Sequence, residues 1–296
     1  AEIPLVVVEA TRQGPATGLP TWTSQGDLNF VLGAGHGEFL RVVLTPGDVR
    51  EHFLLAKLAM ELAEKYQLPV LIMSDKYILE SLQSMPKMVM DLKNSRLSMI
   101  NDGQLGENNL IEGEYLRYSA TENGISPRSI PGQNNAWQLS NSYEHDEYGF
   151  ATEDAVTTKK AVEKRMAKLT ALKQDLPKPF YLGAKNPQQI FISFGSTINV
   201  LKDVLLDDVA KNLAVIHLPC IYPFPSEELE VLLSGKNAET FIVEGNATGQ
   251  LTALIKRETK LQNFRSILRY DGRPFYSEDL IDFLKTQKID QQYKLI

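Results

Sequence analysis

The sequence predicts an α/β protein with two domains, and three features carry this prediction. A strand–helix–strand pattern spans residues 41–73, a second alternation of strands and helices begins at residue 190, and a stretch rich in proline and glycine lies between them. A chain of 296 residues is comfortable for two domains. We therefore expect domains at 1–176 and 188–296, joined by a linker at 177–187.

The first domain is predicted to contain a parallel sheet. Ile3 to Val8 is a continuous apolar run rich in β-branched residues, which is typical of a buried strand. Arg41 to Leu44 and Leu68 to Met73 are predicted to be two further strands. Between them, Asp48 and Glu51 form a D-x-x-E capping box in front of apolar residues at helical spacing. Because a helix separates these two strands, we expect them to pair in parallel.

The middle of the chain lacks the strand and helix patterns of the residues before it. Residues 85–150 show no clear periodicity and are rich in Gly, Pro, Asn, Ser and Tyr. Such a long irregular segment is usually functional, interface-building or disordered, and its many aromatic residues argue against simple disorder. Residues 153–173 are then predicted to form one strongly charged amphipathic helix.

The second domain is predicted from four apolar runs separated by helix signals. The expected strands are Ile190–Phe194, Ala214–Leu218, Thr240–Val243 and Ile267–Tyr270. Ser226 and Ser277 are each followed by two acidic residues, which is typical of a capped helix start with an acidic first turn. His217, inside an apolar run, is expected to be a core residue.

Composition restricts the classes of partner. The formal net charge of -6 gives no electrostatic basis for binding nucleic acid or an anionic membrane, and no apolar run is long enough to span a membrane. Cys220 is the single cysteine, so an internal disulfide and a cysteine-ligated iron–sulfur cluster held by this chain alone are excluded. With no secretory signal at its start, the chain is expected to be cytoplasmic.

The strongest candidate site is Arg12 to Thr21, R-Q-G-P-A-T-G-L-P-T, directly behind the first predicted strand. The Arg12 guanidinium can bind a carboxylate or phosphate through two parallel N–H bonds. Gly14 and Gly18 allow close approach of a ligand, and the prolines stiffen the loop. Open α/β sheets bind ligands at this end of their strands. The loop could equally pair Arg12 with Glu9 and serve only as a connection.

Three other polar segments have simpler interpretations. Gly33 to Gly37 has the spacing G-x-G-x-G with no clear helix behind it, so a dinucleotide site is not predicted, and His36 and Glu38 are more simply a hydrogen-bonded turn than an acid–base pair. Glu144 to Gly149 fits an ordered loop or interface better than a metal site. Glu244 to Leu251 could hold an anion at a helix start, or be an Asn-capped helix start.

Taken together, these segments resemble a known family. Arg12 to Thr21 resembles the R-G-G-P-S-T-G-L-P-T signature of the α subunit of 2-oxoacid:ferredoxin oxidoreductases, especially the 2-oxoglutarate type. The similarity continues in order through Gln25–Leu28, His36–Glu38, Asn123–Arg128, Glu144–Gly149, Tyr222–Pro225, Asn246–Leu251 and Tyr270–Phe275. Single matches are weak, but their joint order over nearly the whole chain indicates homology.

The resemblance implies a specific activity and fold. These enzymes use thiamine diphosphate with Mg²⁺ to decarboxylate a 2-oxoacid oxidatively, pass electrons through an iron–sulfur cluster to ferredoxin, and release an acyl-CoA from coenzyme A. Their α subunit has a thiamine-pyrimidine-type domain followed by a transketolase-C-like domain. By resemblance, Arg12 would bind the substrate carboxylate and Thr21 would help to position the substrate, since a 2-oxoacid must be oriented before its keto group reacts.

The resemblance also implies what this chain lacks. The family's Y-P-I-T-P loop and the glutamate that activates the cofactor would precede Ala1, so we expect a fragment or processed product with a truncated first domain. Gln13 and Ala16 replace a usual Gly and Ser. A separate β subunit would hold most of the cofactors, in a dimer of heterodimers, and this chain alone would be inactive.

The alternatives are a related transketolase-like or 2-oxoacid dehydrogenase subunit, and a non-catalytic assembly or anion-binding module.

Overall fold

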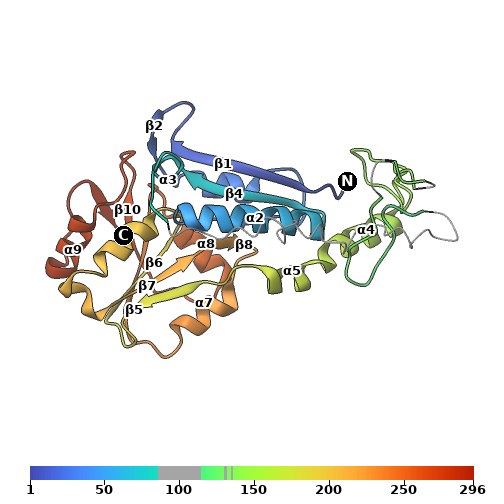
Figure 1. The fold of residues 1–296 in the computed structure, drawn as a ribbon. Coiled ribbons are helices and arrows are strands. Elements are labelled where there is room, and N and C mark those ends of the chain that lie inside the picture. Colours follow the sequence, from blue (N-terminus) through green and yellow to red (C-terminus); the bar gives the residue numbers. More distant parts are fainter. Residues whose placement is uncertain (86–114, 130–131, 135) are drawn as a thin grey trace.

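The computed structural model describes residues 1–85, 115–129, 132–134 and 136–296, which contain two β-sheets flanked by helices (Figure 1). The first sheet has the order β2-β1-β4-β3-β8, with β1 (Leu5–Gln13), β2 (Leu19–Thr23), β3 (Val42–Leu44), β4 (Pro69–Asp75) and β8 (Cys220–Tyr222). The second has the order β11-β10-β9-β6-β7-β5, with β5 (Phe180–Gly183), β6 (Gln189–Phe194), β7 (Leu213–Leu218), β9 (Glu239–Glu244), β10 (Arg265–Arg269) and β11 (Tyr293–Leu295).

The helices lie mostly between these strands in sequence. They are α1 (Leu28–Gly33), α2 (Val49–Tyr66), α3 (Lys76–Leu79), α4 (Ala155–Ala167), α5 (Leu169–Asp175), α6 (Thr197–Val204), the 3₁₀ helix η1 (Asp208–Asn212), α7 (Ser226–Leu233), α8 (Gln250–Glu258) and α9 (Ser277–Thr286). The described part of residues 85–150 contains no helix or strand longer than a single bridge, as the sequence predicts; 86–114, 130–131 and 135 lie outside the described residues.

The predicted α/β class is confirmed, and the pairing is richer than expected. β1, β4 and β3 pair in parallel, as do β7, β6, β9 and β10. The sheets are nevertheless mixed, because the edge strands β2, β8, β5 and β11 pair antiparallel. β8 comes from the second half of the chain, and β5 lies within the predicted linker, 177–187. The domain division remains a prediction.

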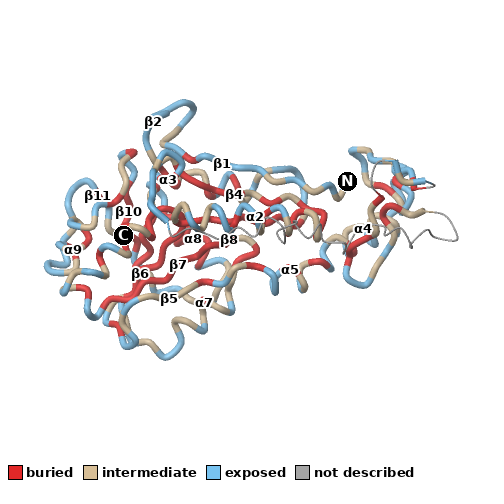
Figure 2. Tube along the Cα trace, in the orientation of Figure 1, coloured by how far each residue is buried: buried red, intermediate tan, exposed pale blue. Residues whose placement is uncertain are grey.

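The prediction of a buried first strand is wrong. β1 is longer than expected, and much of it is exposed (Figure 2). Leu5 and Val8 remain 52% and 57% exposed. Among the described strands, only β4 pairs with β1 from Leu5 to Thr11, while β2 reaches it only at Arg12 and Gln13. An apolar run predicts a strand, but burial also needs neighbours on the second edge and on both faces.

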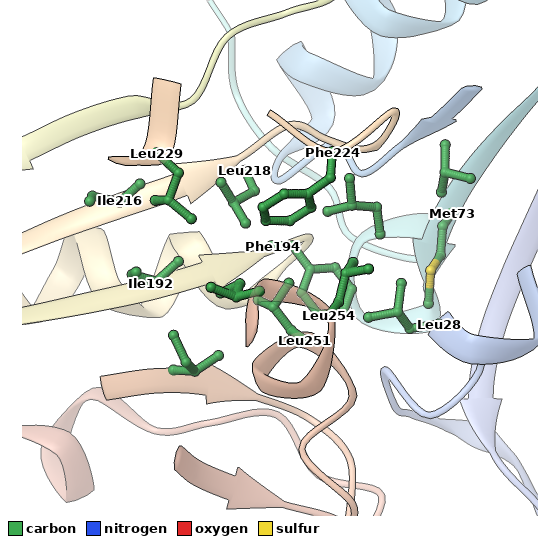
Figure 3. Close-up of a cluster of buried hydrophobic side chains, with 14 of the residues drawn as sticks. Leu28, Met73, Ile192, Phe194, Ile216, Leu218, Phe224, Leu229, Leu251 and Leu254 are labelled. Carbon is green, nitrogen blue, oxygen red and sulfur yellow. The ribbon is translucent and has the colours of Figure 1, made fainter. Parts of the chain in front are cut away.

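One hydrophobic cluster joins the two sheets (Figure 3). Leu28 and Met73 from the first half of the chain pack with Phe194, Leu218 and other buried residues from the second half. These side chains are at most 6% exposed, and the cluster is continuous across the two sheets. Because protein interiors are close-packed, such a shared core holds the two sheets in a fixed relation.

The predicted capping of α2 is confirmed. Asp48 Oδ1 accepts a hydrogen bond from the backbone N–H of Glu51 at 2.9 Å. The Glu51 carboxylate accepts from the backbone N–H of Gly47 at 2.7 Å, one residue earlier than the standard box. The serines proposed as caps do not act as such, since Ser226 and Ser277 are the first helical residues and the preceding residues make no side-chain cap bond.

Asp48→Ala is expected to lower the free energy of unfolding by about 1–2 kcal/mol. The change removes the helix cap together with a 2.9 Å ion pair between Asp48 and Lys202 of α6. Chemical denaturation of the variant measures the loss. Asp282→Ala is the matched control, because Asp282 is 74% exposed and lies 3.7 Å from Lys285; its expected change is within about 0.5 kcal/mol. Equal losses in the two variants would contradict a capping role.

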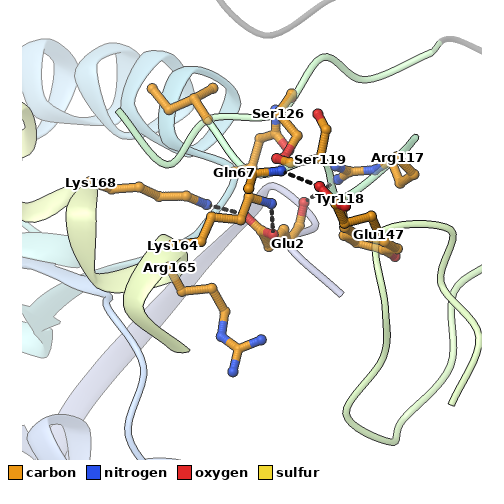
Figure 4. A network of polar contacts seen from close by, with 12 residues as sticks. Glu2, Gln67, Arg117, Tyr118, Ser119, Ser126, Glu147, Lys164, Arg165 and Lys168 are labelled. Carbon is orange, nitrogen blue, oxygen red and sulfur yellow. Dashed lines mark hydrogen bonds and ion pairs between the residues drawn. The ribbon is translucent and has the colours of Figure 1, made fainter. Parts of the chain in front are cut away.

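A buried ion cluster lies at the far end of the molecule from β2 (Figures 1 and 4). The Glu2 carboxylate pairs with Lys164 at 2.6 Å and with Lys168, and these side chains are at most 6% exposed. Arg117 donates to the carbonyl oxygen of Glu2 at 2.8 Å. Burial alone would raise the pKa of Glu2, but the two ammonium groups outweigh it and lower this pKa to about 2.

Two sequence interpretations fall in this same region. The single helix predicted over 153–173 is two helices, α4 and α5, which meet at Lys168, whose ammonium group is held by Glu2. The segment Glu144 to Gly149 is an ordered loop. Its Asp146 Oδ1 accepts from three backbone N–H groups at 3.0 Å, and Glu144 binds Arg165 through both oxygens at 2.6 and 2.9 Å.

None of the helices in the described ranges combines the length and apolar character that crossing a membrane requires.

Candidate functional site

The segment Arg12 to Thr21 is a β-hairpin rather than a loop behind a strand. Arg12 is the penultimate residue of β1, and Thr21 lies in the middle of β2. The pairing register is Arg12↔Thr23 and Gln13↔Leu19, with an irregularity between them. Both predicted site residues are exposed, and the hairpin projects from the end of the sheet (Figures 1 and 2). The sequence placed the segment at the correct end of the sheet but missed the antiparallel strand.

Gly18 allows the tight turn of this hairpin. Its φ of +49° lies in the left-handed region, and a Cβ at this position would overlap the carbonyl group of Gln13. Arg12 Nε donates to the carbonyl oxygen of Thr17 at 3.2 Å, so the arginine side chain folds back along its own turn.

Gly18→Ala is expected to speed amide hydrogen exchange within residues 13–23 more than tenfold, because the Cβ must displace backbone. Gly235→Ala is the matched control: Gly235 has a φ of +69°, but its Cβ would have no atom within 4 Å. Mass-spectrometric hydrogen exchange reports both variants. Hairpin exchange as slow in Gly18→Ala as in the control would show that the clash is relieved without opening the turn.

Two carboxylates surround the base of the hairpin. Desolvation raises the pKa of Glu9 and of Asp27, while the nearby Arg12 charge lowers both without overcoming it. The backbone N–H of Arg12 also lies close enough to the Asp27 carboxylate to lower its pKa as a donor. Among the described residues, the Arg12 guanidinium forms no side-chain ion pair within 4.0 Å; its side-chain hydrogen bond is the one to Thr17. Arg12 therefore offers an exposed cation with N–H donors available to an anion.

The second half of the chain packs against the hairpin. The backbone N–H of Thr23 donates to the carbonyl oxygen of Gly272 at 3.1 Å, and the Arg273 guanidinium lies 3.2 Å from the centre of the Trp22 ring. A Cβ at Gly272 would come within 2.7 Å of Leu19. The predicted segments Arg12–Thr21 and Tyr270–Phe275 are therefore in direct contact.

Gln25 makes the densest set of contacts at this junction. It is 4% exposed, and its Nε2 donates to the carbonyl oxygen of Phe194 at 2.8 Å. Its Oε1 accepts from the backbone N–H of Gly245 at 2.7 Å and from the Thr197 hydroxyl at 3.3 Å. Its own N–H donates to the carbonyl oxygen of Gly245 at 2.7 Å. One side chain thus links the hairpin segment to β6, α6 and the loop after β9.

Asp75, at the end of β4, is a second buried polar residue here, and the sequence analysis did not single it out. It is 3% exposed, and burial raises its pKa even though the side chains of Ser196 and Thr23 hydrogen-bond to it. Its Oδ1 also accepts from the backbone N–H of Ile78 at 3.4 Å. Its place at the carboxyl end of a predicted parallel strand was the available signal.

The segment Glu244 to Leu251 is an Asn-capped turn, as one of the two interpretations predicts. Asn246 Oδ1 accepts from the backbone N–H groups of Thr248, Gly249 and Gln250 at 2.9–3.2 Å. The first amides of α8 are already bound by the chain itself: the fully buried Glu244 carboxyl group accepts from Leu251 at 2.7 Å and from the following residue. This helix start is therefore filled.

Thr21 lines an open pocket of about 300 Å³ beside the hairpin. Its other lining residues are Trp22, Thr23, Lys76, Tyr77, Glu80, Pro274 and Tyr276. The pocket combines aromatic rings with a lysine, and Arg12 lies on the hairpin but is not among these lining residues.

The remaining predicted segments do not join this site. Asn123–Arg128 and Glu144–Gly149 lie at the far end with α4, and His36 and Glu38 are exposed. Tyr222–Pro225 borders a different pocket of about 200 Å³. His217 is fully buried with its Nε2 3.2 Å from Glu51, and burial raises the pKa of Cys220 to about 12, so both are core residues as predicted.

The described residues offer little to a metal ion. No group of three or more His, Cys, Asp or Glu side chains within them could hold one. At the site itself, the chain supplies an exposed arginine, hydroxyls, aromatic rings and two flanking carboxylates. The arginine and the hydroxyl donors of this set suit recognition of a small anion.

The chain matches a family model and is similar in sequence to known proteins. The family model described as pyruvate flavodoxin/ferredoxin oxidoreductase, thiamine diphosphate-binding, matches residues 1–165. The α subunit of 2-oxoacid:ferredoxin oxidoreductase 1 from Sulfurisphaera tokodaii is 35% identical over 289 residues, which cover 96% of this chain and 44% of that protein. The 2-oxoglutarate synthase subunit KorA from Methanocaldococcus jannaschii is 26% identical over 262 residues, 88% of this chain and 67% of that one.

The fold is also found in a solved structure. The 2-oxoglutarate:ferredoxin oxidoreductase from Magnetococcus marinus, with 2-oxoglutarate, coenzyme A and succinyl-CoA bound, superposes with a TM-score of 0.84 at 27% identity, over 96% of this chain and 48% of that one. The chain thus spans less than half the length of the first of these relatives. On the match over 1–165 and the sequence similarity over 96% of its length, the chain belongs to the pyruvate flavodoxin/ferredoxin oxidoreductase, thiamine diphosphate-binding family.

Proposed function

We propose that this chain supplies the substrate-carboxylate site of the α subunit of a 2-oxoacid:ferredoxin oxidoreductase. The reaction is the oxidative decarboxylation of a 2-oxoacid, with coenzyme A as acyl acceptor and ferredoxin as electron acceptor. One observation carries the proposal: Arg12 presents an exposed guanidinium that forms no side-chain ion pair with any described residue, on a hairpin that two sheets hold in place. Family membership supports the reaction class.

Arg12 is proposed to bind the carboxylate of the 2-oxoacid through parallel N–H···O bonds. A planar guanidinium matches a planar carboxylate, and this match fixes the orientation of the adjacent keto carbon. Thr21 is proposed to contact the substrate from β2, in the same hairpin.

Thiamine diphosphate is proposed to be held outside the described residues. The helix start best suited to a diphosphate, that of α8, is filled by Glu244, and no group of acidic, His or Cys side chains in the described ranges fits its Mg²⁺. These two features support the proposal that the diphosphate and its Mg²⁺ are held elsewhere. We propose that a β subunit holds the cofactor and the iron–sulfur cluster, in a dimer of heterodimers in the cytoplasm.

The test is the activity of the complete enzyme, purified with its partner subunit. Reduction of ferredoxin that requires both a 2-oxoacid and coenzyme A is the expected result. A complex that assembles and binds 2-oxoacids without reducing ferredoxin would instead support a non-catalytic assembly or anion-binding module.

The substrate is proposed to be of the 2-oxoglutarate type, on the similarity to 2-oxoglutarate enzymes. The ratio of kcat/KM for 2-oxoglutarate, pyruvate and a branched 2-oxoacid checks this finer proposal. A preference for pyruvate would contradict it and leave the 2-oxoacid class intact.

A further inference from the structure

We propose that Gln25 and Asp75 are positioning residues that fix the Arg12–Thr21 hairpin to the second sheet, so that the second half of the chain sets the place of the substrate carboxylate. This inference rests on the proposed function of Arg12. Neither side chain is proposed to touch the substrate.

The hairpin's own sheet holds it weakly. β2 pairs with β1 at two positions only, and the segment from Pro15 to Trp22 is exposed. A two-stranded ribbon of this size is marginally stable in isolation. Its position must therefore be set by contacts with other parts of the chain.

Those contacts come from buried polar groups. The side chain and the backbone N–H of Gln25 together make four hydrogen bonds. Three of them are to backbone groups of Phe194 and Gly245, and the fourth is to the Thr197 hydroxyl. Backbone partners cannot rotate away, and a buried amide that loses them is left with unsatisfied polar atoms. Gln25 therefore holds the chain directly behind β2 at a fixed distance from β6 and β9.

Asp75 acts from the other side of the same turn. The side chains of Thr23, the last residue of β2, and of Ser196 lie close enough to Asp75 to lower its pKa as hydrogen-bond partners. A Cβ placed on Gly195, whose φ is +58°, would lie 3.0 Å from Gln25 Nε2 and 3.8 Å from Asp75 Oδ2. The two side chains thus flank Gly195, and this turn is one of the places where the hairpin segment meets the second half of the chain.

The geometry has a direct consequence for binding. Arg12 and Thr23 are register partners, so a shift of Thr23 moves the backbone that carries Arg12. Small displacements of a positioning group reduce the rates of oriented reactions strongly. Loss of the Gln25 and Asp75 contacts should therefore weaken use of the 2-oxoacid and leave use of coenzyme A unchanged.

The experiment uses the complete enzyme with Gln25→Leu in this chain, and Gln262→Leu as the matched control on an exposed glutamine. Hydrogen exchange of residues 13–26 and steady-state KM values for the 2-oxoacid and for coenzyme A are measured. Gln25→Leu is expected to speed exchange at Thr23 and Gln25 at least tenfold and to raise the KM for the 2-oxoacid about tenfold, with the KM for coenzyme A unchanged. The control is expected to match the wild type in all three.

If the enzyme with Gln25→Leu does not assemble, milder variants at Thr197 provide the test. Thr197→Val removes one hydroxyl bond to Gln25, and Thr197→Ser retains it. Faster hairpin exchange and a higher 2-oxoacid KM in Thr197→Val, with both restored in Thr197→Ser, support the inference.

The outcomes separate this inference from the proposed function. Unchanged hairpin exchange in Gln25→Leu overturns the positioning role whatever the kinetics show. A loosened hairpin with an unchanged 2-oxoacid KM also overturns it if Arg12→Ala raises that KM in the same assay. If Arg12→Ala has no effect either, the carboxylate role of Arg12 is what fails.

Discussion

Arg12→Ala in the complete enzyme is expected to lower kcat/KM for the 2-oxoacid by about 100-fold or more, with a raised KM and a reduced kcat. The lost N–H donors would contact a charged carboxylate, and each such bond contributes about 1.5–3 kcal/mol. Turnover falls as well because the keto group is no longer oriented. Steady-state kinetics with saturating coenzyme A and ferredoxin measure both effects.

Two variants sharpen this prediction. Arg12→Lys keeps the charge but not the planar fork, so an intermediate loss is expected. Arg257→Ala is the matched control, since Arg257 is 63% exposed near the end of α8 and pairs with Glu258. If the kinetics of Arg12→Ala match those of this control, Arg12 does not bind the substrate carboxylate.

Glu2→Gln is expected to have the largest effect on stability, lowering the free energy of unfolding by about 3 kcal/mol. The change leaves Lys164 and Lys168 buried without their carboxylate, and burial already lowers the pKa of both lysines. Chemical denaturation measures the loss. Glu61→Gln is the control: this glutamate forms a 3.7 Å surface pair with Lys57, and its loss should cost less than about 1 kcal/mol.

The same carboxylate predicts a pH dependence. Because the pKa of Glu2 is lowered from 4.5 to about 2 on folding, its contribution is fully present above pH 4.5 and is lost as the pH falls toward 2. The difference in stability between wild type and Glu2→Gln should therefore shrink between pH 5 and pH 3. A difference that stays constant over this range would show that Glu2 is not held as a carboxylate by the two lysines.

The periodic parts of the fold were predictable from the sequence. Asp48 and the apolar spacing behind it specify α2, and the run Ile190–Phe194 becomes the central strand β6, because in both cases burial enforces the local pattern. The strand β2 was missed because its five residues, Leu19 to Thr23, are mostly exposed and carry no alternation. The edge strand β5 was missed because two prolines precede it and resemble a linker.

The roles of Arg12 and Thr21 remain predictions, made because their segment is rich in binding groups and resembles a family signature. The contacts that hold this segment could not be predicted from the sequence. The contacts of Gln25 with Gly245 join residues 220 positions apart, and no local pattern encodes such a pairing. The same holds for the Glu244 carboxylate, which fills a helix start that looked free in sequence.

The most direct test of the central claim compares a 2-oxoacid with its uncharged carboxamide in the wild-type enzyme and in Arg12→Ala. If Arg12 binds the carboxylate, the wild type should favour the acid in kcat/KM by about 100-fold, and Arg12→Ala should lose most of that preference. An equally large preference for the acid in Arg12→Ala would contradict the carboxylate role of Arg12, because another group would then bind the carboxylate.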